Sequence, residues 1–268
     1  IGGSLRGGTG SDSGEVTVIG NIGPIKIGRD FVGGSVGGTA SNFNTGYIQS
    51  LGRIVSITVG GSIISGIDAS TGTLATSAAI HAARDIGSLT VRGSLIGNIN
   101  AGAVSPVVIS ASRQATPGAL DLAIGKITIG GRVERAQILA GYSISLVADN
   151  GNASVGPVSV GGNWIASDLV AGVQDDASAA LNASFGEADD LVVPGFGGAP
   201  VATIVSVSIK GLVLGTAATG DHFGFVAQQI GSFKSLKSFA SLTPLTAITD
   251  VPIELALLSG DVTIREVP

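Results

Sequence analysis

One apolar–polar–apolar pattern recurs six times and constrains the fold more than any other feature of the chain. Counted from an apolar anchor, the third and fifth residues that follow are apolar in every copy, and the residue between them is polar. The anchors are Ile22, Ile54, Ile86, Ile124, Val155 and Ile204. Alternation with a period of two predicts a β-strand that buries one face.

A corner and a second strand are expected after each of these strands. Glycine occupies the seventh place after the anchor in five copies, and Arg29 occupies it in the first. The ninth place is apolar in all six copies: Phe31, Ile63, Leu95, Val133, Trp164 and Val213. A third apolar stretch often follows, as at residues 107–109 and 144–147. Each unit therefore predicts three strands joined by corners.

The spacing of the anchors identifies the architecture. Successive anchors are 32, 32, 38, 31 and 49 residues apart, so the strand columns persist while a connection changes length. This predicts an all-β, right-handed parallel β-helix of six to eight coils, with insertions at one corner. Aromatic residues make up only 4 %, which fits a narrow interior, and the outward Thr and Ser side chains are expected to face solvent. A β-sandwich or Greek-key barrel is the alternative, and it gives no reason for six copies of one pattern.

The two ends of the chain carry related segments. Residues 2–5 resemble residues 60–63 in the middle of a unit, so the chain is expected to start inside a coil. Residues 260–264 echo residues 14–18 and predict a strand near the C-terminus, and residues 230–234 begin one more unit. We therefore expect β-helix coils with variable corner insertions over residues 1–222, and a last coil with a C-terminal cap over residues 223–268.

Composition and charge exclude several classes of protein. The absence of Cys excludes zinc ribbons, iron–sulfur proteins and thiol enzymes. The net charge of −5 argues against nucleic acid as a partner, since no basic stripe faces the phosphates. Gly or polar residues interrupt every apolar run, so no membrane span is expected. The absence of Met, even at position 1, suggests a chain processed or excised from a longer precursor.

No catalytic constellation emerges from the sequence. The two histidines, His81 and His222, have no Ser beside them in an elbow motif and are expected at corners or on the surface. Asp68, Asn100 and Asp168 fall near one place of the second strand, where a small polar residue typically bonds the backbone of a corner. The chain is therefore predicted not to be an enzyme.

Carbohydrate binding or cleavage is the alternative function, because many parallel β-helices act on polysaccharides. It predicts exposed aromatic side chains along a groove, and the chain offers Tyr47, Tyr142 and Trp164 as its only Tyr and Trp residues. Trp164 lies in an inward column, which favours a role in the core.

The Gly-rich runs do not predict nucleotide binding. Residues 33–38 and 195–198 lack the Gly-Lys-Ser/Thr ending of a phosphate-binding loop. We expect both runs to be corners that need positive φ.

An acidic insertion is the strongest local feature. Five of the nineteen acidic residues lie within sixteen positions: Asp175, Asp176, Glu187, Asp189 and Asp190. Calcium takes six to eight oxygen ligands from carboxylates and carbonyls on flexible loops. These residues form a candidate calcium site, the only cofactor expected. A solvated acidic loop is the alternative interpretation.

Units such as residues 86–95 resemble the repeat regions of very large secreted or surface proteins of environmental bacteria, planctomycetes in particular. The stretches 185–190 and 221–231 are similar to the ends of such proteins. The resemblance implies a parallel β-helix stalk, export to the bacterial surface and an adhesive or envelope role. It implies no catalytic residues.

These observations together predict an extracellular structural or adhesive β-solenoid. Its open first coil could pair with a C-terminal strand of a neighbour, near Val262 and Ile264, and so build a filament or surface layer. The expected partners are further copies or neighbouring solenoid segments, and surface glycan is the alternative partner.

Overall fold

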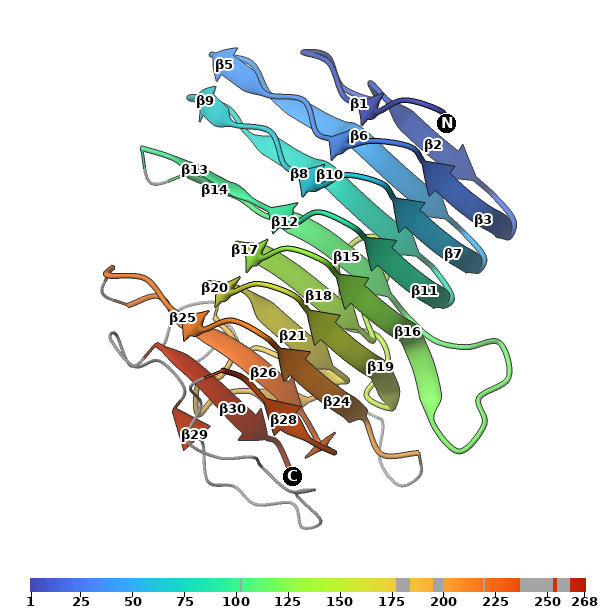
Figure 1. Ribbon diagram of the computed structural model, residues 1–268, viewed down its shortest axis with the longest axis vertical. Helices are drawn as coiled ribbons and strands as arrows, with labels where there is room; N and C mark the ends of the chain where they lie inside the picture. Colours follow the sequence, from blue (N-terminus) through green and yellow to red (C-terminus); the bar gives the residue numbers. More distant parts are fainter. Residues whose placement is uncertain (102, 177–183, 195–199, 219, 237–252, 255–260) are drawn as a thin grey trace.

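Three long β-sheets make up the chain (Figure 1). The computed structural model describes residues 1–101, 103–176, 184–194, 200–218, 220–236, 253–254 and 261–268, and these residues contain strands and no helix. Neighbouring strands of the long sheets run parallel, except that β29 is antiparallel to β30. Up to residue 234 the chain passes through these sheets, called A, B and C, in that order in every coil, and its last described strands return to sheet B. This all-β arrangement confirms the predicted class and is compatible with a β-solenoid.

Sheet A contains β1 (Leu5–Arg6), β4 (Phe31–Val32), β8 (Ile63–Ile64), β12 (Leu95–Ile96), β17 (Val133–Glu134), β20 (Trp164–Ile165) and β25 (Val213–Leu214). Sheet B contains β2 (Glu15–Val18), β6 (Asn42–Ser50), β10 (Leu74–Ala82), β15 (Val107–Ala111), β18 (Ala136–Ala140), β21 (Asp168–Ala171), β26 (Phe223–Ala227), β30 (Val262–Glu266) and β29 (Ile253–Glu254). Sheet C contains β3 (Ile22–Ile27), β7 (Ile54–Val59), β11 (Ile86–Val91), β16 (Asp121–Ile129), β19 (Ala153–Val160), β24 (Thr203–Ile209), β27 (Gln229–Ile230) and β28 (Phe233–Lys234). Three small pairs lie outside these sheets: β5 (Val36–Gly38) with β9 (Asp68–Ser70), β13 (Asn98–Asn100) with β14 (Ala103–Ser105), and β22 (Val173–Gln174) with β23 (Leu191–Val192).

In sheet C, the residues that the sequence places in one column are paired with one another in adjacent strands. All six anchors are paired in one row, from Ile22 with Ile54 to Val155 with Ile204. Ile230 continues that row, as the predicted further unit requires. The apolar residues at the ninth place form the corresponding row of sheet A.

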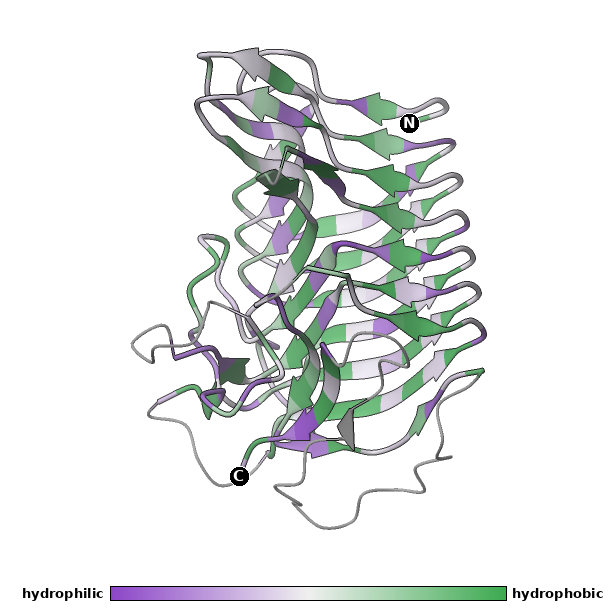
Figure 2. Cartoon of the chain, turned by 90° about the vertical axis from the view of Figure 1, so that its left-hand side faces the viewer, coloured by the Kyte–Doolittle hydropathy of each residue, from purple (hydrophilic) through white to green (hydrophobic). Residues whose placement is uncertain are grey.

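These inward rows form one continuous core. From the second coil onward the column residues are essentially inaccessible to solvent, and Figure 2 shows apolar residues recurring at the same place of successive coils. Burying each such Ile, Val or Leu contributes about 1.5–3 kcal/mol. Aromatic side chains fill the interior near the C-terminal end, where Trp164, Phe225 and Phe233 are in ring contact. The interior is therefore wide enough for aromatic rings, contrary to the expectation.

Insertions occur at two corners, and the prediction of one variable corner was wrong. The connection from sheet C to sheet A always has three residues, at 28–30, 60–62, 92–94, 130–132, 161–163 and 210–212. Long connections leave sheet A at residues 97–106 and sheet B at residues 172–202. The constant corner is the one that carries the repeated glycine.

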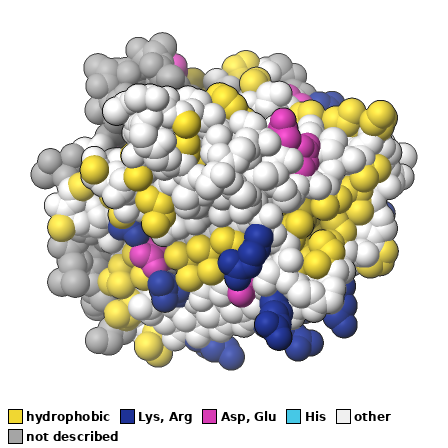
Figure 3. Space-filling model, turned by 90° about the horizontal axis from the view of Figure 1, so that it is seen from above, with side chains coloured by type: hydrophobic (Ala, Val, Ile, Leu, Met, Phe, Trp, Pro, Cys, Tyr) yellow, Lys and Arg dark blue, Asp and Glu magenta, His cyan; other side chains and the backbone are white. Residues whose placement is uncertain are grey.

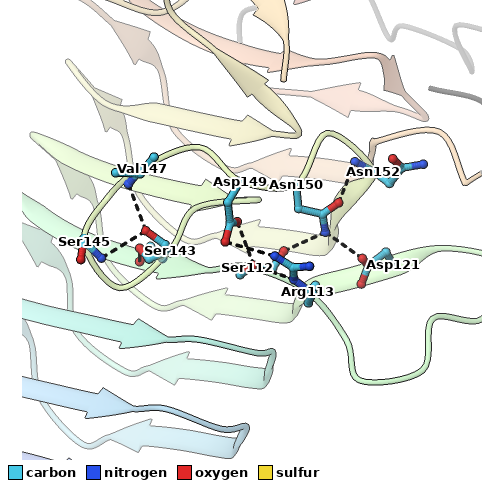
Figure 4. A network of polar contacts seen from close by, with 10 residues as sticks. Ser112, Arg113, Asp121, Ser143, Ser145, Val147, Asp149, Asn150 and Asn152 are labelled. Atoms are coloured by element: carbon cyan, nitrogen blue, oxygen red, sulfur yellow. Dashed lines mark hydrogen bonds and ion pairs between the residues drawn. The ribbon is translucent and has the colours of Figure 1, made fainter. Parts of the chain in front are cut away.

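The predicted third strand at residues 144–147 is a turn. The third strand of that coil is β18, and Leu146 has a φ of 58°. Polar contacts tie the turn to the preceding coil (Figure 4): Ser112 donates to Asp149 at 2.8 Å, and Asn150 donates to Asp121 at 2.8 Å. The apolar residues 144–147 therefore belong to a turn outside the stacked coils and not to a core strand.

The outer face of sheet B is covered, which corrects the expectation of a solvated outer face. A second apolar cluster lies there, formed by outward residues of sheet B, by residues of the 141–152 turn and the 172–202 connection, and by Val267. We call it the second layer; its buried members are Tyr47, Ala79, Val108, Leu139, Tyr142, Val170, Val173, Phe185, Val226 and Val267. Sheet C keeps the expected pattern, since Thr58, Thr90 and Thr128 are partly exposed.

Most corner glycines are required for space and not for positive φ. Within residues 33–38 only Gly38 has a positive φ, so the expectation fails for this run, and residues 195–198 lie outside the described residues. A Cβ on Gly66 would lie 1.8 Å from the carbonyl oxygen of Gly34 in the preceding coil. Coils ~4.8 Å apart leave no room for that methyl group.

Replacing Gly66 with Ala is expected to lower the free energy of unfolding by about 3 kcal/mol, because a backbone oxygen cannot move aside within a stacked coil. Gly37→Ala is the matched control, since nothing lies within 4 Å of its Cβ position. Urea unfolding followed by circular dichroism compares the two. Equal effects of both substitutions would contradict the explanation.

Candidate functional site

The first coil exposes residues that every later coil buries. Leu5, Val16, Ile22 and Ile25 point into the core but remain partly exposed. Their partners one coil later are Phe31, Ile48, Ile54 and Ile57, which are 0–1 % exposed. We call these four first-coil residues the N-terminal end face; Figure 3 views the molecule from this end and shows hydrophobic patches with Lys and Arg along one side.

The sheet edges at this end are open except at the end of β3. β1, β2 and β3 each terminate their sheet, so no described strand pairs with their outer edges. Ile1 occupies the end of the β3 edge: its ammonium group donates to the Lys26 carbonyl at 2.9 Å, and the Gly28 N–H donates to the Ile1 carbonyl at 2.9 Å. An open parallel edge is a template for another strand.

The opposite end is closed in one sheet only. The predicted C-terminal strand is β30, which lies between β26 and β29. Val262 and Ile264 are 0 % and 1 % exposed, and β29 already occupies the outer edge of β30, so this strand has no free edge next to Ile264 for a neighbour. Among the described strands, sheets A and C end at β25 and at β27 with β28.

A cleft of about 470 Å³ lies beside sheet B, between the β13–β14 hairpin and residues 216–223. Its walls are mainly apolar and include Ile99, Val104 and Phe223. Asp168, Gln137, Asp221, His222 and Arg135 are its principal polar lining residues.

Asp168 is the buried carboxyl group of this cleft. It is 5 % exposed, and its Oδ1 accepts a hydrogen bond from the backbone N–H of Gly224 at 3.0 Å. Burial raises the pKa of Asp168 to about 7, against the opposing effect of hydrogen bonds from Gly224 and the Gln137 side chain. Asp168 therefore bonds backbone as predicted, while Asp68 bonds the backbone of Ser70 and Leu74 in a separate corner.

Asp221 and His222 connect loops at the rim of the cleft. Thr216 donates to Asp221 Oδ2 at 2.5 Å, and His222 Nε2 lies 3.1 Å from the hydroxyl of Thr263. Both residues are partly exposed. Their contacts fit the structural role expected of this pair.

His81 is buried and not at a corner, which corrects the expectation. Its Nδ1 lies 2.6 Å from Ser110 Oγ, because the two residues are paired in adjacent strands of sheet B. Both side chains are 0 % exposed, and burial lowers the pKa of His81 to about 4. A substrate could not reach this Ser–His pair.

The acidic residues gather at the end of the β22–β23 hairpin. Asp190 is 2 % exposed, and the backbone N–H of Gly186 donates to its Oδ2 at 2.7 Å. Burial, together with Asp189 and Asp175, raises the pKa of Asp190 to about 7, against the opposing effect of the Gly186 N–H and Arg265. Burial also raises the pKa of Asp175, with contributions from Asp189, Glu187 and Asp176. The structure thus brings all five predicted residues into one electrostatic group, and the interpretation as a freely solvated loop does not fit Asp190.

The described residues form no ready-made metal site, and their Tyr and Trp rings are not exposed. No three His, Asp or Glu side chains in those ranges are arranged to hold a metal ion. Tyr47, Tyr142 and Trp164 are all buried, so none offers a ring to a sugar. Within the same ranges, no helix has the length and apolar character of a membrane span.

Sequence reasoning missed the second layer and the cleft. Both depend on how the connecting segments fold back over sheet B. These segments do not repeat from coil to coil, so the sequence pattern does not place them. The His81–Ser110 pair could have been found by extending the columns to the third strand, since these residues are one coil apart. Comparison of the chain with protein-family models, curated proteins and solved structures gives no match.

Proposed function

We propose that the chain is a right-handed parallel β-helix that acts as an extracellular structural or adhesive element and assembles end to end. Seven coils are inferred, one for each strand of sheet A. The right-handed path is inferred because connections between parallel strands of one sheet are almost always right-handed. The proposed role at the bacterial surface rests on the resemblance of the repeats to those of large secreted or surface proteins of environmental bacteria.

The partly exposed N-terminal end face is the observation that carries the proposal. Its residues belong to columns that are otherwise fully buried. A further coil stacked on it would bury them and pair the open edges of β1 and β2 and the part of the β3 edge that Ile1 leaves open.

The proposed occupant is the C-terminal end of a second copy, through β25 and β28. Parallel strands have polarity, so the last strands of one copy can continue the first strands of the next in the same direction. Such a head-to-tail contact does not close on itself and produces a filament.

Light scattering across a range of protein concentrations tests the proposal. The mass is expected to rise above 26.2 kDa as concentration increases. The double variant Val16→Lys with Ile22→Lys places charges on two open edges and is expected to remain at the monomer mass. Ile19→Lys is the matched control, because Ile19 is 84 % exposed and lies outside the strands. A constant 26.2 kDa for the unmodified protein, or assembly of the double variant, would overturn the proposal.

Glycan binding in the cleft is the second candidate function. The juxtaposition of apolar walls with Asp168, Gln137, Asp221 and His222 favours it. Chemical-shift changes at these residues on addition of neutral oligosaccharides would support it. Absence of such changes at millimolar sugar would exclude this role for the cleft.

A further inference from the structure

The β22–β23 hairpin brings the two ends of the acidic stretch together. Gln174 pairs with Leu191 in an antiparallel ladder. The next positions outward are Asp175 and Asp190, so these residues face each other just beyond the last pair. Asp189 and Glu187 lie in the loop that leads into Asp190.

Several buried carboxylate oxygens in this group have no partner. Asp190 Oδ1, both oxygens of Asp189, Glu187 Oε2 and Asp175 Oδ1 are shielded from solvent and accept no hydrogen bond from the described residues. The Asp190 side chain is 0 % exposed. Buried polar atoms are nearly always satisfied in native proteins, so a group of five such oxygens points to a missing ligand.

Among the described residues, Arg265 is the cation that lies beside this group. Arg265 Nε is 4.0 Å from Asp190 Oδ2, and Arg265 Nη2 donates to the backbone carbonyl of Ala188 at 3.3 Å. One guanidinium cannot balance several carboxylates, and an uncompensated buried carboxylate costs several kcal/mol. The missing ligand is therefore a cation.

The chemistry of the donors selects a hard cation. All the unpartnered acceptors here are oxygens, and neither Cys nor His belongs to the group. Calcium accepts six to eight oxygens in a flexible geometry, whereas magnesium demands a near-ideal octahedron. Since no three acidic side chains of the described residues converge, carbonyl oxygens and water must complete the carboxylate ligands of such an ion.

We propose that the loop at residues 186–190 binds one calcium ion through the carboxylates of Asp189 and Asp190, with backbone carbonyls and water completing the shell. Asp175 and Glu187 supply the surrounding negative charge. The loop itself is joined to the second layer by Phe185, which packs against Tyr142, and to β30 by the hydroxyl of Thr263, which donates to the Gly186 carbonyl at 2.7 Å.

Calorimetric titration of the chelator-treated protein with calcium chloride tests the proposal, with magnesium chloride as the comparison ion. One calcium per chain and a rise in the melting temperature with calcium are expected. Asp189→Asn and Asp190→Asn are each expected to weaken binding at least tenfold. Asp12→Asn, which removes an exposed carboxylate in the first coil, is expected to leave binding unchanged.

Terbium luminescence provides a readout that does not depend on the stability of the variants. The Tyr142 ring is 6.4 Å from that of Phe185 beside the loop, so it is expected to sensitise terbium in the unmodified protein. Calcium is expected to displace the terbium, and Tyr142→Phe to reduce the signal. No heat at millimolar calcium, or equal affinity in the Asp12 and Asp190 variants, would overturn the proposal.

Discussion

Replacing Asp168 with Asn is expected to raise the free energy of unfolding by on the order of 4 kcal/mol at pH 8, and to change it little at pH 4. Burial raises the pKa of Asp168 from 3.8 to about 7 in the folded chain. Between pH 3.8 and pH about 7, Asp168 holds a proton in the folded chain that it has released in the unfolded chain. The stabilising effect of this proton is complete below the unfolded pKa and is lost as the pH rises through the folded pKa.

Asn reproduces the neutral form of this side chain at every pH. Its oxygen can still accept from the Gly224 N–H, and its NH2 group can donate to the Gln137 side chain. Asp221, His222 and Arg135 line the same cleft, and they are present in both proteins. The difference between wild type and variant therefore isolates the effect of Asp168.

Urea unfolding from pH 4 to pH 8 measures this difference. Asp12→Asn controls for the loss of one exposed carboxylate and is expected to show no comparable dependence on pH. A difference that stays constant with pH, or a variant that is less stable than wild type at pH 8, would contradict the assignment.

Replacing Trp164 with Ala is expected to destabilise the fold by about 3–5 kcal/mol. Trp164 is 0 % exposed, and its ring lies 4.9 Å from that of Phe225, which in turn contacts Phe233. The substitution leaves a cavity in the sheet A column between Val133 and Val213. It also removes the hydrogen bond from Trp164 Nε1 to the Ser167 carbonyl at 2.9 Å.

Two further variants separate packing from hydrogen bonding. Trp164→Phe keeps an aromatic ring but not the donor, and is expected to cost about 1–3 kcal/mol. Phe43→Ala removes a ring that is 48 % exposed and should change stability by no more than about 0.5 kcal/mol. Far-ultraviolet circular dichroism in urea reports all three variants. Similar losses for Trp164→Ala and Phe43→Ala would show that the column is not a core.

The repeated rows of the fold could be predicted from the sequence because each inward residue stacks on its equivalent in the next coil. Ile54 and Ile86 share a row for the same reason that they share a place in the pattern. The position of Trp164 followed from its column in the same way. In a solenoid, each repeat contacts only its neighbours, so the repeat pattern in the sequence directly predicts which residues are in contact.

The insertions follow no such rule, and the errors lie there. Leu146 belongs to an apolar stretch, yet a positive φ and the polar contacts of the corner make that stretch a turn. His81 is buried on the outer face of sheet B, where its ring lies 5.3 Å from that of Tyr47, a member of the second layer. The acidic residues were found from their density in the sequence, but the burial of Asp190 depends on how residues 184–192 fold against the second layer.

Cryo-electron microscopy of concentrated protein tests the central claim most directly. We expect filaments in which β-strands repeat every ~4.8 Å along the axis and the repeat runs without interruption through each junction between copies. At the junction, β1 and β3 of one copy should be paired with β25 and β28 of the next. Single particles at every concentration, or copies joined side to side with their end faces exposed, would contradict the proposed end-to-end assembly.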